Sequence, residues 1–480
     1  MNFRMIFNNI GKILLIEAAL LFLPLLVSLI YKETNQYAYL ITIGALLCAG
    51  VLLCLIKPKT KQIYAREGFI LVGLSWIVMS LFGSLPFVIS QEIPSFVDAL
   101  FETISGFTTT GASILTNVEG LSKSMLFWRS FTHWIGGMGV LVFILAILPN
   151  SEGQNIYILR AESTGPQVGK LVSKVRFTAR ILYLIYLGLT LLEVIFLLFG
   201  GNSFYDSLVT SLATAGTGGF GIYNDSIASF NSYSQIVIGV FMLIFGINFN
   251  IFYLILIGRI AQAFKSEELR WYVGVIVFSV VAIAINLTLS MEYAFHIALK
   301  DSFFQVSSII TTTGFATADF NLWPNLSKCI LLILMFVGAC AGSTGGGMKV
   351  SRFVILFKSL KREIKKLVHP NSVSNITFEG STVDENVVKG VNGYFGIMMC
   401  IIFASLIVLS FDKLDFETNF TAIVACVNNI GPGFSLVGPM GNYSCFNDFS
   451  KIILSALMLI GRLEIYPILL LFMPKVWFNK

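Results

Sequence analysis

The chain has 480 residues, of which 56% are hydrophobic and only 12% are charged. A soluble domain carries about 25% charged residues, so the composition excludes a soluble enzyme and a disordered chain, and the modest net charge of +6 does not suggest nucleic-acid binding. The seven cysteines contain no C-x-x-C pair and are odd in number, which argues against a metal cluster or a disulfide framework.

Apolar runs of about 20 residues, the length needed to cross a bilayer, recur from end to end and predict an all-α polytopic membrane protein. The first run follows a basic start and is too long for a signal-peptide core, so we expect it to be a retained first span. The ten predicted spans lie near residues 11–31, 37–56, 68–90, 126–149, 181–200, 234–258, 272–291, 328–348, 391–410 and 452–473.

The segments between these spans alternate in charge. One set, which includes both termini, carries 24 of the 32 Lys and Arg residues, and the other set carries seven. Positive residues concentrate in cytoplasmic loops of membrane proteins, so we expect both termini and the basic loops to be cytoplasmic. The most basic loop, 349–390, is either a surface for anionic lipid headgroups or a docking surface for a regulatory subunit.

Four external segments contain an apolar stretch that is too short to cross the bilayer. Aligned with one another, they define a unit that is used four times: a span, a short helix, a turn rich in Gly and Thr, and a second span. Each short helix begins near an Asp or a Thr, and a glycine follows 13 residues later. The pairs are Asp98 and Gly111, Asp206 and Gly219, Asp301 and Gly314, and Thr418 and Gly431.

Such a unit has the properties of an ion filter. A helix that is N-capped by the Asp or Thr directs its partially negative C-terminus into the protein, where a cation is favoured. Irregular backbone at membrane depth is tolerated only if it is buried in protein or lines a water-filled path. Four turns around one axis therefore predict facing carbonyl and Thr oxygens that hold a dehydrated monovalent cation. Gly and Thr also let membrane helices pack closely, but four copies on one side favour the filter.

The eighth span is interrupted by residues 338–347, which include five glycines. Each glycine costs about 1 kcal/mol relative to Ala in a helix, so a straight helix is not expected. We interpret the segment as a mobile intramembrane loop below the filter, with tight helix packing as the alternative. A phosphate-binding P-loop is excluded because an apolar helix precedes the segment and Met348 separates Gly347 from Lys349.

Arg462 lies about ten residues into the last predicted span, where a charge is costly and usually functional. A fixed positive charge below the filter would oppose the accumulation of cations and limit their flow. The alternative is a structural ion pair with Glu193, since Glu464 lies on roughly the opposite helix face.

Several motifs together resemble the Trk/Ktr family of bacterial potassium-uptake proteins. They are TTTGAS at 108–113, WIGGMG at 134–139, TTTGF at 311–315, GSTGGGMK at 342–349, NNIGPG at 428–433 and GRLEIYP at 461–467. The resemblance covers essentially the whole chain, and the two additional N-terminal spans resemble the TrkH-type branch.

The resemblance implies a potassium-translocating subunit with one pore per chain. It implies a homodimer in the bacterial cytoplasmic (inner) membrane, gated by a cytosolic, nucleotide-binding, TrkA-like regulatory subunit. K⁺ is then the permeating ion, with no organic cofactor in this chain, and neither enzymatic activity nor nucleic-acid binding is expected.

The implied site residues form two groups. The filter residues are Thr109, Thr110, Gly111, Gly218, Gly219, Thr312, Thr313, Gly314, Asn429, Ile430 and Gly431. The gate residues are Gly342, Ser343, Thr344, Gly345, Gly346, Gly347, Lys349 and Arg462. Repeats 2 and 4 depart from the Thr-Thr-Gly pattern, so Gly219 rests on its spacing from Asp206, and Gly433 is an alternative to Gly431.

The expected domain organisation follows the repeats. It comprises a two-span extension (1–60), pore repeat 1 (61–150), pore repeat 2 (151–260), pore repeat 3 with the gating loop (261–370) and pore repeat 4 (371–480).

An alternating-access cation symporter coupled to protons or sodium is the alternative function. Such transporters usually contain inverted repeats, whereas the four repeats here all begin and end inside. An intramembrane enzyme would need a set of catalytic groups, and the spans hold too few ionisable residues to provide one. The same filter serves a channel and a symporter, so the sequence leaves both open.

Overall fold

The computed structural model describes residues 2–58, 65–139, 175–372, 374–474 and 477. The described chain is mostly helical, which confirms the predicted all-α class. Its only strands within these ranges form a small antiparallel hairpin of β1 (Thr377–Phe378) and β2 (Ser381–Thr382).

The N-terminal extension consists of α1 (Phe3–Leu20), α2 (Phe22–Ile30) and α3 (Gln36–Cys54). α1 and α2 together form one candidate membrane span, and α3 forms another. α1 and α3 pack closely at two glycines, because a Cβ on Gly11 would lie 2.8 Å from the carbonyl oxygen of Gly50.

The rest of the described chain repeats a long helix, a short helix and a third helix, which is broken in the last three units. The long helices are α4 (Ala65–Gly83) with its continuation α5 (Leu85–Ile89), α10 (Val175–Phe199), α15 (Glu267–Met291) and α19 (Glu385–Leu409). The short helices are α6 (Phe96–Phe107), α11 (Phe204–Gly216), α16 (Phe295–Ile310) and α20 (Phe416–Val427). The broken helices are α12 (Ser232–Phe245) with α13 (Phe249–Leu256) and α14 (Ile260–Phe264), α17 (Asn325–Phe336) with α18 (Val350–Val368), and α21 (Asp448–Arg462) with α22 (Tyr466–Leu471). In the first unit, α7 (Lys123–Gly137) takes this place.

Three of the predicted spans are broken helices, and a fourth is described only in its first part. α12 and α13 meet at 91°, α17 ends well before α18 begins, and α21 and α22 are separated at Ile465, whose φ is +68°. The span predicted at 126–149 starts as α7, and its second part, like most of the basic loop 150–180, lies outside the described residues. Of the ten predicted spans, the interruption of the eighth is confirmed. Hydropathy missed the other breaks because it measures apolarity and not helical continuity.

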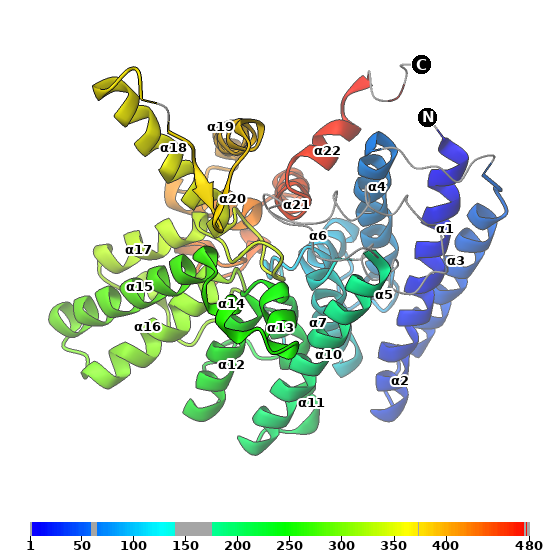
Figure 1. Ribbon diagram of the computed structural model, residues 1–480. Helices are drawn as coiled ribbons and strands as arrows, with labels where there is room; N and C mark the ends of the chain where they lie inside the picture. The colour runs from blue at the N-terminus through cyan, green and yellow to red at the C-terminus, as the bar shows by residue number, and fades with distance from the viewer. Residues whose placement is uncertain (1, 59–64, 140–174, 373, 475–476, 478–480) are drawn as a thin grey trace.

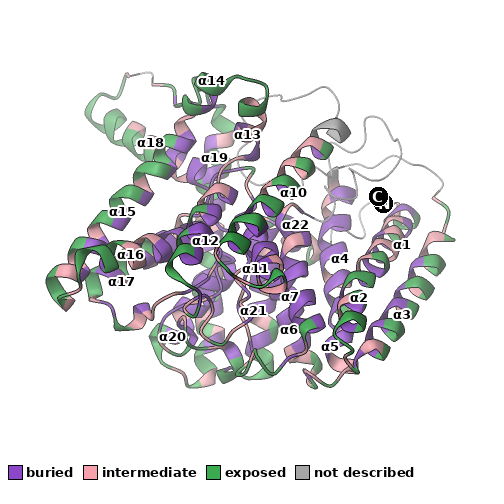
Figure 2. Cartoon of the chain, turned by 90° about the horizontal axis from the view of Figure 1, so that it is seen from below, coloured by how far each residue is buried: buried purple, intermediate pink, exposed green. Residues whose placement is uncertain are grey.

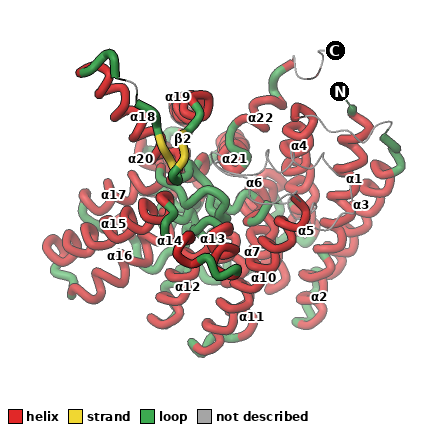
Figure 3. The backbone as a smooth tube through the Cα atoms, viewed as in Figure 1, coloured by secondary structure: helices red, strands yellow, loops and turns green. Residues whose placement is uncertain are grey.

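The repeated units are arranged around a common centre (Figure 1). The last unit closes against the first, because α21 packs against α6 and α22 packs against α4. Irregular segments gather in the middle, surrounded by helices (Figure 3). Both termini and α18 lie on the same side of the molecule in Figure 1.

The helices bury their polar side chains and expose many apolar ones. Buried residues concentrate where the inner helices meet, and exposed residues follow the outer faces (Figure 2). The outer faces carry large apolar side chains such as Phe199 and Leu289, both 79% exposed, whereas the threonines of the central loops are fully buried. Extended apolar surface is rare on soluble monomers and is expected where helices face lipid.

Candidate functional site

The four loops that follow the short helices share one backbone conformation. The residue two positions before each predicted glycine has a positive φ: Thr109 (+54°), Thr217 (+53°), Thr312 (+59°) and Asn429 (+53°). The glycines also have positive φ: Gly111 (+77°), Gly219 (+78°), Gly314 (+85°) and Gly431 (+96°). Because this region is rare for other residues, the repeated pair of angles marks a common motif. Gly433 does not share it, so Gly431 holds the position equivalent to Gly111.

The four loops close into a ring. Each glycine lies so near the carbonyl oxygen just before the next loop's glycine that an added Cβ would overlap or press on that oxygen. The contacts run from Gly111 to Gly218, from Gly219 to Thr313, from Gly314 to Ile430 and from Gly431 back to Thr110. Any side chain at these glycines would therefore push neighbouring loops apart.

The first and third loops each contain the same internal side-chain contact. The hydroxyl oxygens of Thr108 and Thr110 lie 2.8 Å apart, and those of Thr311 and Thr313 lie 2.8 Å apart. These hydroxyl pairs stabilise the conformation of each loop, and the contacts between loops are made by backbone carbonyl oxygens.

The fourth loop is tied to its neighbours by an amide. Nδ2 of Asn429 donates to Oγ1 of Thr110 at 3.0 Å and to the carbonyl oxygen of Met458 at 2.9 Å. Asn429 thereby joins the fourth loop to the first loop and to α21, which closes the ring with a side-chain bond as well as a backbone contact.

The short helices begin earlier than predicted. The N-caps are Ser95, Ser203 and Asp415, which accept hydrogen bonds from the backbone N–H groups of Asp98, Asp206 and Thr418. The prediction that Asp98, Asp206 and Thr418 are N-caps is therefore wrong. Each is instead the third residue of its helix, where the acidic side chains of Asp98 and Asp206 still interact favourably with the positive helix end. In the third unit, α16 begins at Phe295, so Asp301 lies inside the helix.

Hydrogen bonds from the side chain and backbone of Thr418 hold the pKa of Asp415 below its usual range. The other end of each short helix leads directly into the ring, so four partially negative C-termini adjoin it. The arrangement favours a cation at the centre.

A buried ion pair connects the first loop to the second. Arg129 on α7 lies 2.7 Å from Glu102 on α6, and both side chains are almost completely buried. Glu102 also accepts hydrogen bonds from Ser113 Oγ at 2.9 Å and from the N–H of Ile114 at 3.0 Å. Arg129 donates to the carbonyl of Gly221 at 3.3 Å. The sequence does not predict this pair. The signals that could have indicated it are a Glu inside an apolar short helix and an Arg at a span boundary.

His133 joins the first two units. Its Nδ1 lies 2.7 Å from the carbonyl oxygen of Gly106, and its Nε2 accepts a 3.3 Å hydrogen bond from the N–H of Phe220. The carbonyl requires a proton on Nδ1, and the N–H requires a lone pair on Nε2, so this geometry selects the neutral imidazole. The imidazole also packs on Gly218, where a Cβ would overlap it.

The intramembrane loop, residues 337–349, lies against the ring. The N–H of Gly346 donates to Oγ1 of Thr312 at 2.7 Å, and a Cβ on Gly346 would lie 2.6 Å from the Cβ of Asn429. Of the predicted gate residues in this segment, Gly342 is exposed, Ser343 is half-buried, and Thr344, Gly345, Gly346, Gly347 and Lys349 are buried.

Arg462 connects this loop to the C-terminal ends of α21 and α7. At the end of α21, its guanidinium donates to the carbonyl of Thr344 at 2.8 Å and to the carbonyls of Gly136 at 2.5 Å and Gly137 at 2.8 Å. Nζ of Lys349 donates within the loop, to the carbonyl of Gly345 and, at 3.3 Å, to that of Gly346. Two cationic side chains therefore lie beside the ring, on the side where the loop packs.

Glu464 has a different partner from those weighed for Arg462. Its carboxylate pairs with Arg352, on the first turn of α18, and the Arg352 guanidinium lies 4.0 Å from the centroid of the Tyr394 ring. This contact joins the break between α21 and α22 to the helix that follows the intramembrane loop.

The ring offers oxygen atoms as ligands and little else. Among the described residues, no group of three or more His, Cys, Asp or Glu side chains is placed to hold a metal ion. Uncharged carbonyl and hydroxyl oxygens suit a monovalent cation that has lost part of its hydration shell.

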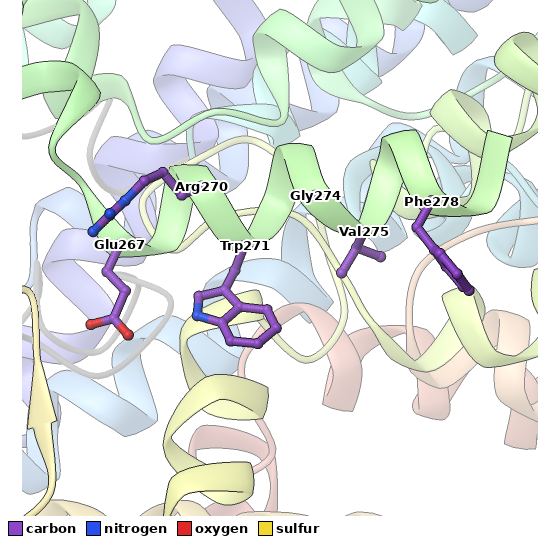
Figure 4. A pocket seen from close by; sticks show the side chains of 6 residues that line it. All are labelled: Glu267, Arg270, Trp271, Gly274, Val275 and Phe278. Carbon is purple, nitrogen blue, oxygen red and sulfur yellow. The ribbon is translucent and has the colours of Figure 1, made fainter. Parts of the chain in front are cut away.

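A separate groove of about 520 Å³ lies on α15. Figure 4 shows its lining along this helix: Glu267, Arg270, Trp271, Gly274, Val275 and Phe278. None of these is a predicted filter or gate residue, so we do not assign the groove to the ion path.

Comparison with known proteins gives a consistent result. Residues 33–478 match the TrkH family, described as a cation transport protein. The chain is 36% identical to the Trk system potassium uptake protein TrkH of Escherichia coli (strain K12), over 99% of this chain and 100% of that protein. It is 33% identical to TrkG of the same strain, over 95% and 94% of the two chains. The crystal structure of the potassium transporter TrkH from Vibrio parahaemolyticus superposes with a TM-score of 0.90 at 32% identity, covering 99% of this chain and 100% of the other.

Proposed function

Because the chain belongs to the TrkH family of cation transport proteins, we propose that it takes up potassium through the ring of four loops. The observation that carries this proposal is the closed set of contacts between each glycine and the next loop's carbonyl. The relatives named for potassium uptake match over nearly their whole length, which supports potassium as the permeating ion.

The selectivity filter is formed by the predicted residues of the four loops. Their carbonyl oxygens replace water around a dehydrating K⁺ ion, and the four helix C-termini favour its positive charge. The filter residues are Thr109, Thr110, Gly111, Gly218, Gly219, Thr312, Thr313, Gly314, Asn429, Ile430 and Gly431.

The gate is the intramembrane loop together with Arg462. The loop packs on the filter through Gly346, and the Arg462 guanidinium holds it through Thr344. In this position the loop blocks the path below the filter, and the positive charges of Arg462 and Lys349 oppose the passage of cations. Opening then requires the loop to move and the Arg462 hydrogen bonds to break.

The protein is a multi-pass protein of the bacterial inner membrane and acts with regulatory partners of the Trk system. We further propose that both termini are cytoplasmic, that two copies form a homodimer, and that a cytosolic nucleotide-binding, TrkA-like subunit acts on the gate. Supporting this orientation, the two termini and the basic helix α18 lie on one side (Figure 1). The proposed domain boundaries remain 1–60, 61–150, 151–260, 261–370 and 371–480.

The test is tracer uptake into liposomes that contain the purified protein. With a potassium gradient as the driving force, we expect rubidium to accumulate and sodium to be excluded. Gly111→Ser should let sodium through, because its side chain would displace the carbonyl of Gly218. The control is Gly188→Ser, since a Cβ on Gly188 meets no atom within 4 Å.

A Gly111→Ser variant that excludes sodium as well as the parent does would contradict the filter assignment. If the parent takes up no rubidium, the assay is repeated with the 342–347 segment shortened, which should open the gate. Absence of uptake in that variant too would favour the alternating-access symporter.

A further inference from the structure

Glu268 lies behind the intramembrane loop, on the first turn of α15. One of its carboxylate oxygens, Oε1, accepts hydrogen bonds from the N–H of Ala341 at 2.8 Å and from the N–H of Ser351 at 3.1 Å. The side chain is buried, with 5% exposure. A single oxygen atom therefore holds the chain at the two ends of the segment that contains Gly342 and Lys349.

The loop is also bonded to the break between α12 and α13. The N–H of Cys340 donates to the carbonyl of Gly246 at 3.0 Å, and the carbonyl of Gly342 accepts from the N–H of Phe249 at 3.0 Å. Further along the loop, Oγ1 of Thr344 donates to the carbonyl of Phe245, at the end of α12, at 3.2 Å.

The two ends of the loop are also bonded to each other, from the N–H of Gly338 to the carbonyl of Met348 at 2.8 Å and from the N–H of Val350 to the carbonyl of Ala339 at 3.2 Å. Because Glu268 accepts from both ends, it anchors this joined base of the loop to α15.

The neighbouring residue has a different environment. Glu267 lines the outer groove of α15 (Figure 4) and pairs with Lys358 of α18 at 2.5 Å. Successive residues of a helix point about 100° apart, which is why one glutamate reaches the loop and the next reaches the surface. Lys358 also donates to the carbonyl of Thr377 in the hairpin, at 2.7 Å.

The β1–β2 hairpin fixes the start of α15. Glu379, in its turn, accepts hydrogen bonds from Ser266 Oγ at 2.8 Å and from the backbone N–H of Glu268 at 3.0 Å. The hairpin lies between α18 and α19, on the side of the molecule where both termini lie. A continuous series of hydrogen bonds therefore runs from this surface through Glu379 and Glu268 to the loop.

We propose that Glu268 is a positioning residue for the gate, which keeps the intramembrane loop closed under the filter by anchoring both of its ends to the first turn of α15. This inference rests on the proposed function of the loop as the gate. A displacement of the hairpin would move the first turn of α15, and the Glu268 carboxylate would then release or shift both ends of the loop.

Removing the carboxylate leaves two buried N–H groups without an acceptor, which favours conformations in which they find other partners. We expect Glu268→Ala to raise rubidium flux about tenfold without changing the preference for rubidium over sodium. Glu268→Gln keeps an oxygen acceptor in the same place, and we expect its flux to stay within about twofold of the parent. Glu292→Ala, at the other end of α15 and exposed, is the control and should leave flux unchanged.

A second measurement reports on the loop itself. Cys340 is a native thiol of the loop and is fully buried. In full-length protein whose other cysteines are replaced by serine, and whose rubidium flux matches the parent, the rate of Cys340 modification by a soluble maleimide measures how often the loop opens. We expect Glu268→Ala to raise this rate about tenfold and Glu268→Gln to leave it nearly unchanged. A purely structural defect would instead lower the melting temperatures of both variants and would not produce this difference in Cys340 modification.

The outcomes separate this inference from the function on which it rests. If shortening the 342–347 segment raises flux but Glu268→Ala changes neither flux nor Cys340 modification, Glu268 does not position the gate and the gate assignment stands. If shortening the segment leaves flux unchanged, the gate assignment itself is wrong. Equal effects of Glu268→Ala and Glu268→Gln would also overturn the inference, because they would show that the charge matters and the acceptor position does not.

Discussion

Arg462 donates a 2.8 Å hydrogen bond to the carbonyl oxygen of Thr344, and this bond joins the end of α21 to the intramembrane loop. The same guanidinium reaches the carbonyl of Gly137 on α7 at 2.8 Å. Hydrogen bonds from a charged donor are about twice as strong as neutral ones. One side chain of the fourth unit therefore holds together the loop of the third unit and the end of α7 in the first unit.

Replacing Arg462 should open the path. The loss of a charge-assisted hydrogen bond costs about 1.5–3 kcal/mol, so we expect Arg462→Ala to raise rubidium flux by about tenfold or more. Arg462→Lys keeps the charge but cannot reach several carbonyls at once, and its flux should be intermediate. Initial rates of rubidium uptake into liposomes measure both.

The control for this experiment is Arg270→Ala, because Arg270 lines the outer groove of α15 and not the loop. If Arg462→Ala transported rubidium at the same rate as the parent and as Arg270→Ala, Arg462 would have no part in the gate.

The ring contact can be separated from backbone strain. Gly219 and Gly201 both have a positive φ, +78° and +81°, so alanine is strained by about 1–2 kcal/mol at either position. A Cβ on Gly219 would overlap the carbonyl of Thr313, whereas one on Gly201 meets no atom within 4 Å. We expect Gly219→Ala to lose most rubidium uptake or its selectivity and Gly201→Ala to retain both. Similar behaviour of the two variants would mean that the contact between the second and third loops is unimportant.

The buried Glu102–Arg129 pair should stabilise the fold around the first two loops. Removing one partner leaves a buried charge alone, which typically costs 3–5 kcal/mol, so we expect Arg129→Ala to lower the melting temperature of the detergent-solubilised protein strongly. The double variant Glu102→Gln/Arg129→Ala should lose less than the two single variants added together.

Lys366→Ala provides the comparison, since its pair with Glu363 is half-exposed and such pairs contribute little. A small effect of Arg129→Ala, similar to that of Lys366→Ala, would contradict a supporting role for the buried pair.

The cap of the fourth short helix should show a defined pH dependence. Hydrogen bonds from Thr418 lower the pKa of Asp415 in the folded protein, so the stabilisation is complete above the unfolded value of about 3.9 and is lost as the pH falls through the lower folded value. At pH 7, Asp415→Ala should cost about 1 kcal/mol and Asp415→Asn much less, because Asn is also a good N-cap. Melting curves at pH 7 and at about pH 3 measure the effect. A parent protein that loses no more stability than Asp415→Asn on acidification would contradict this role of the carboxylate.

Much of the candidate site follows from local regularities of the sequence. The 13-residue spacing from Asp206 to Gly219 selects the residue that has the same backbone angle as Gly111, even though the second loop lacks the Thr-Thr-Gly pattern. The spacing works because the four residues from which it is counted lie at nearly the same distance from the C-terminal ends of their short helices, which are Phe107, Gly216, Ile310 and Val427. Five glycines between 338 and 347 likewise predict the break in the eighth span, since glycine is unfavourable inside a helix.

Other features depend on residues that are distant in sequence. The partners of Arg462 lie on α7 and in the intramembrane loop, more than 100 positions away, and no periodicity of the chain indicates them. The prediction places the N-caps three residues too late, at Asp98 and Asp206 instead of Ser95 and Ser203. The reason is that Asp is typical both of the N-cap and of the first helical turn.

Composition and spacing alone determined the membrane class, the fourfold repeat and the register of the four glycines. The first is set by the thickness of the bilayer, and the other two by a local spacing that recurs in each unit. The tertiary structure decided which loop meets which, with Gly111 against Gly218 and so on around to Thr110. It also decided that Glu268 holds both ends of the intramembrane loop. These contacts join separate units of the chain, and their geometry exists only once the helices have packed.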